Sequence, residues 1–201
     1  MFILTSDHGE EIGDRGGWLH DQSVYEELIR VPLIIHFPGG QYGGRRISGH
    51  ASLLDVVPTV MSFLNHPGMV RNSRGLDLMP LLREETVRNE KQMRISSMRI
   101  NRKKYFRPYK ESRGDVNVVV QKGHYKGILN VETDSFELYD IMNDSSEHYD
   151  RSCEKTGLAA EMQTFAEESY EKCLRRSEGT VMAPDLSMEE MEALRKLGYI
   201  D

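Results

Sequence analysis

The chain has few of the residues that would stabilise it by disulfides or hold it in a membrane. Its two cysteines, Cys153 and Cys173, form neither a Cys-x-x-Cys pair nor a zinc-binding spacing, so we expect two free thiols. No apolar run is long enough to cross a bilayer. With 38% hydrophobic and 29% charged residues among 201, the composition is that of a globular protein of one domain, or of one and a part.

The chain also lacks an overall excess of positive charge, but its charges are unevenly placed. Residues 83–126 carry 13 Lys or Arg against 5 Asp or Glu, in a chain whose formal net charge is -6. Within this region, residues 99–113 interleave basic residues with Tyr105, Phe106 and Tyr109. Such a stretch could bind nucleic acid by charge and stacking, or face a sulfated or phosphorylated substrate. We favour a solvated loop and expect no nucleic-acid partner.

The first 83 residues predict an α/β arrangement. Phe2–Ser6 and Val31–Phe37 are apolar runs typical of strands, and the first has the character of a buried strand. A Gly-rich polar loop follows the first run to about residue 21, and residues 23–28 predict a short helix or turn. Apolar spacing over Asp55–Leu64 predicts a helix.

Residues 84–201 predict a second unit of different character. One strand-like run lies near 95–100, and three short runs follow at 116–121, 125–131 and 136–141. Short strands separated by turns favour an antiparallel sheet over βαβ units. Two helices are expected after the sheet. The first covers about 158–174, and the second opens at Ser187 with a capping-box pattern and stops at Gly198.

The first predicted strand ends in residues that can bind a metal. Asp7 and His8 supply a carboxylate and an imidazole, and Gly9 would let the backbone come close to an ion or an anion. In open α/β sheets, ligands bind at the carboxyl ends of strands. Two adjacent residues cannot hold an ion alone, since calcium takes roughly six to eight oxygens and zinc about four ligands. The alternative is a helix-capping Asp beside a solvated His.

The loop that follows holds further groups that could belong to this site. Glu10 and Glu11 could orient a neighbouring ligand or a bound water, although a solvated acidic loop is the plainer interpretation for at least one of them. His20 could present its imidazole to an anionic substrate or leaving group, or be structural. We expect Glu26 and Arg30, four residues apart, to form an ion pair that fixes the loop onto the second strand.

The order of these motifs resembles the sulfatase family of the alkaline phosphatase superfamily. The N-terminal part of the resemblance rests on Thr5–Glu11, Gly13-Asp14, His20, Ser23–Glu27 and Arg30–Ile35. Further agreement lies in the segments Ser52–Val60, Gly75–Leu82, Gly123–Ile128, Phe136–Ile141 and Leu194–Ile200. Asp77 stands where the family usually has Ser. The resemblance therefore covers nearly the whole chain.

The resemblance implies a fold and a site. Residues 1–83 would be the C-terminal part of the alkaline-phosphatase-like α/β catalytic domain, and residues 84–201 a subdomain with a small antiparallel sheet and C-terminal helices. Asp7 and His8 would be two of four ligands of a divalent metal, calcium first, with manganese or magnesium as alternatives. His20 would be the catalytic residue that contacts the sulfate group. The substrate of the whole enzyme would be a sulfated small molecule or saccharide.

Other parts of the family's catalytic machinery have no counterpart in this sequence. The family's nucleophile is a formylglycine made in a Cys/Ser-x-Pro-x-Arg motif, which neither Ser152–Lys155 nor Cys173–Ser177 fits. Two N-terminal metal-binding aspartates are also unmatched. We therefore expect the isolated chain to have no substantial activity as a sulfuric ester hydrolase.

Two alternatives stay open. Asp-His pairs also occur in phosphonate and phosphodiester hydrolases of the superfamily, so the pair does not choose sulfate over phosphate. The other alternative is a non-catalytic, truncated remnant. An unpaired sheet edge at Phe2–Ser6 would favour self-association or pairing with a partner.

Overall fold

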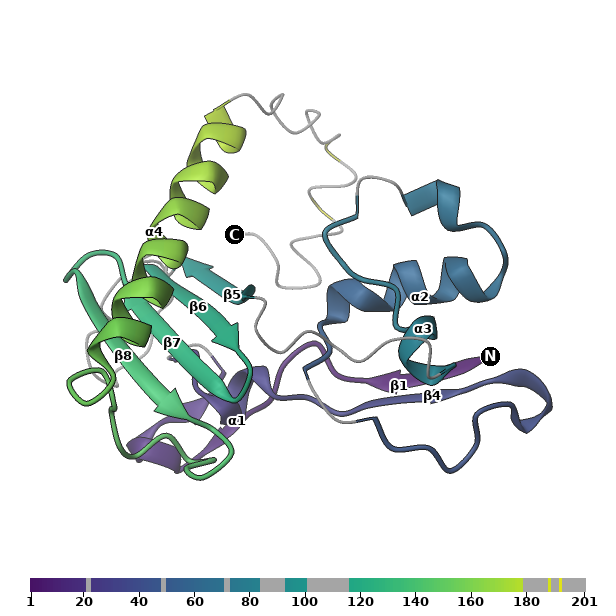
Figure 1. The fold of residues 1–201 in the computed structure, drawn as a ribbon, viewed down its shortest axis with the longest axis horizontal. Helices are drawn as coiled ribbons and strands as arrows, with labels where there is room; N and C mark the ends of the chain where they lie inside the picture. Colours follow the sequence, from purple (N-terminus) through teal and green to yellow (C-terminus); the bar gives the residue numbers. More distant parts are fainter. Residues whose placement is uncertain are drawn as a thin grey trace. The chain divides into compact units, whose positions relative to one another are not determined.

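A computed structural model describes residues 1–20, 23–47, 50–70, 73–83, 93–100, 116–178, 188 and 192. The chain divides into two compact units, residues 1–168 and 169–201. The first unit contains all the strands that the structure describes, and Figure 1 shows its two larger sheets. None of the helices in the described ranges combines the length and the apolar character needed to span a bilayer.

The N-terminal strand belongs to a two-stranded sheet. β1 (Phe2–Thr5) runs antiparallel to β4 (Leu33–His36), with Ile3 opposite Ile35 and Leu4 opposite Ile34. Both predicted strands are therefore confirmed. The expected burial of the first strand was wrong, because Phe2 and Leu4 are 62% and 44% exposed. Alternate side chains of a strand point to opposite faces, and this pair of strands leaves one of its two faces open to solvent.

The Gly-rich loop folds into a short ribbon. β2 (Glu11–Ile12) pairs antiparallel with β3 (Trp18–Leu19) across a 3-10 turn, η1 (Asp14–Gly16). The turn requires left-handed backbone at Gly13, with φ 91°, which glycine adopts without a steric cost. A single helical turn, α1 (Glu26–Ile29), follows and confirms the helix or turn predicted near residues 23–28.

The remaining elements described within the first 83 residues are short helices. They are η2 (Pro38–Gly40), η3 (Leu53–Asp55), α2 (Val56–Phe63), η4 (Pro67–Val70) and α3 (Met79–Leu82). The predicted helix is confirmed as η3 continued by α2. Ser52 begins it with a capping box, because its hydroxyl accepts the Leu54 N–H and its own N–H donates to the Asp55 carboxylate.

Four strands form the antiparallel sheet that the second half of the sequence predicts. β5 (Arg94–Ile100), β6 (Val116–Lys122), β7 (Tyr125–Asn130) and β8 (Ser135–Asp140) lie in chain order. β6 and β7 meet at a tight turn where Gly123 has φ 59°. The register places Val119 opposite Ile128 and Ile128 opposite Glu137.

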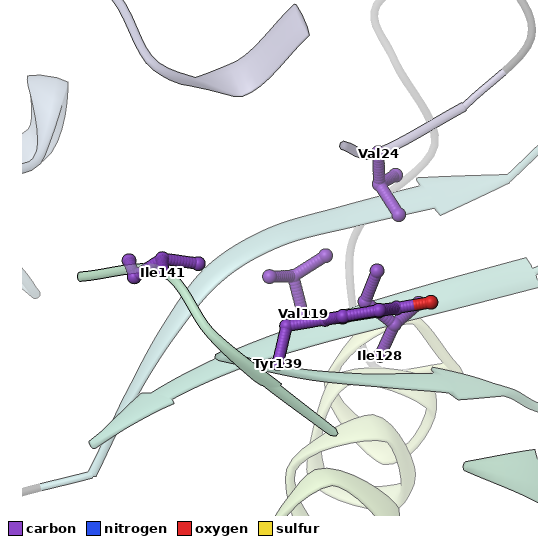
Figure 2. Close-up of a cluster of buried hydrophobic side chains, with 5 residues drawn as sticks. All are labelled: Val24, Val119, Ile128, Tyr139 and Ile141. Carbon is purple, nitrogen blue, oxygen red and sulfur yellow. The ribbon is translucent and has the colours of Figure 1, made fainter. Parts of the chain in front are cut away.

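Each face of this sheet is covered by a different element. One face carries Val119, Ile128, Tyr139 and Ile141, which cluster with Val24, and Figure 2 shows Val24 reaching toward them. The other face includes Val118, Val120 and Leu138, all fully buried. Figures 1 and 2 show that the part of α4 (Thr156–Glu178) within the first unit lies on this second face. Its buried residues Ala159, Met162 and Ala166 follow helical spacing.

Some of the predicted features lie in residues that the structure does not describe. The basic stretch over residues 101–113 and nearly all of the helix predicted from Ser187 lie outside them. The division into residues 1–83 and 84–201 stays a prediction. Cys153 and Cys173 are both free thiols, as expected.

Candidate functional site

The candidate site begins where β1 ends. The Gly9 N–H donates to the Leu28 carbonyl at 2.7 Å and ties the residues after the strand to α1. A side chain at Gly9 would collide with the backbone carbonyl of Glu27. The glycine is therefore required by a close approach of two backbone segments, and its expected approach to an ion stays a prediction.

Asp7 stands at the strand end as an exposed carboxylate. Its side chain is 86% exposed, and its Oδ1 accepts the His8 backbone N–H at 3.0 Å. That hydrogen bond is the main reason that the pKa of Asp7 lies below its ordinary value, with a smaller contribution from the charge of a protonated His8. Asp7 therefore carries its negative charge at neutral pH, which is the form that binds a metal.

The His8 ring is oriented by its own backbone. Its Nδ1 lies 2.8 Å from the Gly9 carbonyl oxygen, and a carbonyl can only accept, so this nitrogen carries a proton. In the neutral ring, Nε2 then keeps the lone pair, and it lies 3.7 Å from Oδ2 of Asp7. Asp7 and His8 together thus offer one oxygen-rich group and one imidazole nitrogen on the same side of the strand end.

The β2–β3 ribbon brings His20 back to this point. Leu19 has a φ of 75°, a left-handed conformation that is uncommon for a residue with a side chain and that redirects the chain just before His20. The His20 ring stacks on the His8 ring, with centroids 4.2 Å apart and planes at 28°. Residues twelve positions apart are therefore adjacent in space.

Glu10 joins these two histidines. Its Oε2 lies 3.3 Å from Nδ1 of His20, and both side chains are 43% exposed. One ligand atom from each of His8, Glu10 and His20 lies within 4.8 Å of the others. In the sequence, Glu10 could be assigned only a supporting role, because nothing in the spacing indicates that the ribbon folds back onto it.

Glu11 differs from its neighbour, since it is 3% exposed. Its Oε1 accepts the Ser23 hydroxyl at 2.6 Å and thereby closes the loop between residues 11 and 23. One of the two adjacent acids is thus solvent-exposed, as expected. The other fixes the loop that carries His20.

Arg15 anchors the middle of the same loop to the residues that follow β8. Its guanidinium lies over the Tyr25 ring at 3.7 Å and donates to Glu27 Oε1 at 3.2 Å, to the Glu147 carbonyl at 3.2 Å and to the Ser146 carbonyl. A planar group with five donors suits such a junction, which lysine could not reproduce. No sequence pattern singled out Arg15, because its carbonyl partners are more than 130 positions away.

A buried ion cluster fixes α1 to the sheet. The Nζ of Lys126 lies 3.1 Å from Oε1 of Glu26 and 2.7 Å from Oε1 of Glu147. The expected pairing of Glu26 with Arg30 is therefore corrected, because the ion pair described for Glu26 is with Lys126. The i, i+4 spacing of Glu26 and Arg30 permits a local ion pair, but Glu26 is buried against the sheet and pairs there with Lys126.

The described residues fit part of a calcium site and do not complete it. Asp7, His8, Glu10 and His20 supply two carboxylates and two imidazoles, whereas calcium takes roughly six to eight oxygens. A calcium ion held by Asp7 and His8 would need further oxygen ligands from outside the part of the chain that the structure describes.

Known sulfatases are similar to parts of this chain. The model of the family described as Sulfatase matches residues 1–66. The chain is 36% identical over 104 residues to the steryl-sulfatase of Mus musculus, and 30% identical over 146 residues to the uncharacterized sulfatase YidJ of Escherichia coli. The chain belongs to the sulfatase family. These matches cover 45% and 72% of this chain but only 16% and 26% of the two relatives.

Solved structures support the same fold for this sulfatase-family chain. A protein in complex with its substrate D-glucosamine-2-N,6-O-disulfate superposes with a TM-score of 0.60 at 24% identity, covering 84% of this chain and 33% of that one. A phosphonate monoester hydrolase from Silicibacter pomeroyi gives a TM-score of 0.60 at 21% identity, covering 86% and 34%. The predicted alkaline-phosphatase-like α/β fold with an antiparallel sheet is confirmed.

Proposed function

We propose that this chain supplies part of the active site of a metal-dependent enzyme that hydrolyses sulfate esters. Asp7 and His8 would be ligands of a divalent metal, calcium first, with manganese or magnesium as alternatives. His20 would contact the sulfate group of the substrate. The observation that supports this proposal is the stacking of His8 and His20 at 4.2 Å beside the ionised Asp7, at the end of β1.

The chemistry that these residues can perform is binding and proton transfer. A bound divalent metal would offset the negative charge of the sulfate oxygens. His20 can donate a hydrogen bond to a sulfate oxygen, or a proton to the departing alcohol, and Glu10 holds its ring in place. The sequence has no Cys/Ser-x-Pro-x-Arg motif, so the nucleophile must come from outside this chain and the isolated chain should be inactive.

The substrate class we propose is a sulfated small molecule or saccharide. Support comes from the relatives, since one acts on steryl sulfates by its name and a structural neighbour binds a disulfated glucosamine. The open edge and face of the β1–β4 sheet also favour self-association of the isolated chain, which stays part of the proposal.

A phosphonate or phosphodiester hydrolase is the second candidate. The phosphonate monoester hydrolase from Silicibacter pomeroyi superposes as well as the sulfated-sugar complex does, with the same TM-score of 0.60. Sulfate and phosphonate esters present similar tetrahedral, anionic oxygens, and His20 would bind either one. The two candidates differ in the nucleophile region, which this chain does not contain.

The test uses the reading frame extended upstream of Met1, alongside the chain itself. We expect the longer protein to hydrolyse 4-nitrophenyl sulfate faster than 4-nitrophenyl phosphate or a phosphonate monoester. His20→Ala should lower kcat by about 10²- to 10⁴-fold, the usual contribution of a positioned acid or base. Faster phosphonate hydrolysis would favour the second candidate, and an upstream stop codon would indicate a remnant.

Metal binding is measured separately by calorimetry with calcium and manganese. In the longer protein, Asp7→Ala should weaken binding at least about 10-fold, because it removes an ionised ligand. In the isolated chain, binding should be weak and nearly unchanged by Asp7→Ala. Tight binding to the isolated chain that Asp7→Ala abolishes would contradict the idea of a partial site and would point to ligands shared across a dimer.

A further inference from the structure

We propose that His8, Glu10 and His20 form a binding site for a zinc-class transition-metal ion that is complete within this chain. This site differs from the calcium site of the proposed function in its ligands and in the ion that it takes. The two sites share only His8, and the new one uses neither Asp7 nor any residue from outside the chain. The inference does not rest on the proposed function.

The spacing of the three groups fits a tetrahedral ion. Zinc is bound at about 2.0–2.1 Å by histidine nitrogen and carboxylate oxygen, so two of its ligand atoms lie about 3.3 Å apart. The distance from Nδ1 of His20 to Oε2 of Glu10 is already 3.3 Å, and a bound ion would displace the proton that now lies between these two atoms. The ligand atom of His8 completes a set within 4.8 Å. Because the side chains of His8, Glu10 and His20 are each 43% exposed, small rotations can close the remaining gap.

The hydrogen bonds of His8 also prepare it as a ligand. Donation from Nδ1 to the Gly9 carbonyl at 2.8 Å leaves Nε2 with the lone pair that a metal needs. The ring is then held by the segment that Gly9 fixes to α1 through Leu28. Metal-binding histidines commonly have a backbone carbonyl or carboxylate on the second ring nitrogen, and His8 has that arrangement before any ion arrives.

The ligand types select the ion. Two imidazoles and one carboxylate are the protein ligands of several zinc enzymes, which keep a fourth position for water or substrate. Such a set favours zinc or copper over calcium and magnesium, which prefer oxygen ligands. One carboxylate leaves a bound Zn²⁺ with a net positive charge, so the fourth position would accept water or an anion.

If the proposed function holds, His8 and His20 belong both to the zinc site and to the sulfatase site. A zinc ion held by His8 and His20 would occupy one ligand of the proposed calcium site and the residue that contacts sulfate. Zinc should therefore compete with calcium and with sulfated substrate in the longer protein.

The test is calorimetric titration of the 201-residue chain with Zn²⁺ alone. Cys153 and Cys173 are both replaced by serine beforehand, since free thiols also bind zinc. We expect one Zn²⁺ per chain, and at least about 10-fold weaker binding in each of Glu10→Gln and His20→Gln. Co²⁺ in place of zinc should give the intense visible absorption of a tetrahedral complex in the parent chain and lose it in both variants.

Controls separate this site from other ligands and from the proposed function. His66→Ala removes an exposed histidine elsewhere and should not change zinc affinity. Asp7→Ala, which removes a ligand of the proposed calcium site, should still bind one Zn²⁺ per chain. Circular dichroism of each variant confirms that the fold is kept. Unchanged zinc affinity in Glu10→Gln and His20→Gln, or no zinc binding by the folded parent chain, would overturn the inference.

Discussion

The buried ammonium group of Lys126 should decide whether α1 stays on the sheet. Lys126 and Glu147 have side chains with no solvent exposure, and the Glu26 side chain is 8% exposed. We consider Lys126→Met, which keeps an unbranched apolar side chain of similar length and removes the charge. The change leaves Glu26 and Glu147 as two buried carboxylates whose shared cation is gone.

The magnitude follows from the distances. At an effective dielectric constant of about 20, contacts at 2.7 and 3.1 Å correspond to gross attractions of about 6 and 5 kcal/mol. Desolvation of the ions offsets most of this attraction, so the intact cluster contributes little net stability. Breaking it is different, because uncompensated buried charges remain. We expect Lys126→Met to lower the free energy of unfolding by about 3–5 kcal/mol.

The effect should depend on pH with a definite sign. Burial raises the pKa of Glu147 above its ordinary value even with Lys126 present, and loss of the ammonium raises it further. A carboxyl with a raised folded-state pKa adds stability below its unfolded value of 4.5, and this stability is lost as pH rises through the folded-state pKa. Lys126→Met should therefore be least destabilising near pH 5 and most destabilising at pH 8.

Urea unfolding followed by circular dichroism measures both effects. Lys122→Met is the matched control, because Lys122 of β6 contacts Glu161 of α4 at 2.6 Å in a partly exposed pair, which should contribute at most about 1 kcal/mol. Adding Glu147→Gln to Lys126→Met should restore part of the loss. The reasoning is refuted if Lys126→Met costs no more than Lys122→Met, or if its cost is the same at pH 5 and pH 8.

Three further substitutions test other contacts by urea unfolding. Gly9→Ala should lower the free energy of unfolding by about 1–3 kcal/mol, because the new Cβ meets the Glu27 carbonyl. Gly157→Ala, which adds a Cβ in open space in α4, should raise it by about 0.5–1 kcal/mol. Equal effects of the two variants would contradict this. Asp55→Asn should cost about 2–4 kcal/mol at pH 7. Burial raises the pKa of Asp55, but hydrogen bonds from Arg94, Leu76 and Ser52 outweigh it and lower the pKa. The stability difference between Asp55→Asn and the parent chain should therefore shrink as pH falls below 3.8. A difference that stays constant with pH would contradict this network. Arg15→Lys should cost about 1–3 kcal/mol through its lost carbonyl contacts, and a neutral result would show that Arg15 does not anchor the loop.

The sequence predicted the elements well where local signals sufficed. Alternation and turn residues located the strands β6, β7 and β8, whose bounds differ from the expected ranges by about one residue. Helical spacing of apolar residues located α4 and the helix formed by η3 and α2. These features depend on residues close together in the chain, which is why a single sequence can indicate them.

The burial of β1 and the partners of charged residues could not be predicted in this way. Phe2 and Leu4 read as core residues, but burial depends on which layer packs against a strand, and an apolar run does not contain that information. Glu26 has a plausible partner four residues away in Arg30, yet it pairs with Lys126, 100 positions away. Only the folded backbone brings that partner close.

The site itself depends on the same long-range contacts. The sequence indicated the adjacent pair Asp7 and His8 as metal ligands and His20 as a group that binds an anion. It did not indicate the contacts that hold the ribbon carrying His20. Glu11 closes the ribbon through Ser23, and Arg15 ties it to backbone carbonyls beyond β8. Because a ribbon with only two paired residues per strand has little stability of its own, the position of His20 must depend on these anchors. The four-stranded sheet β5–β8 therefore supports the site through the residues that follow β8, although none of its residues that the structure describes lies in the site.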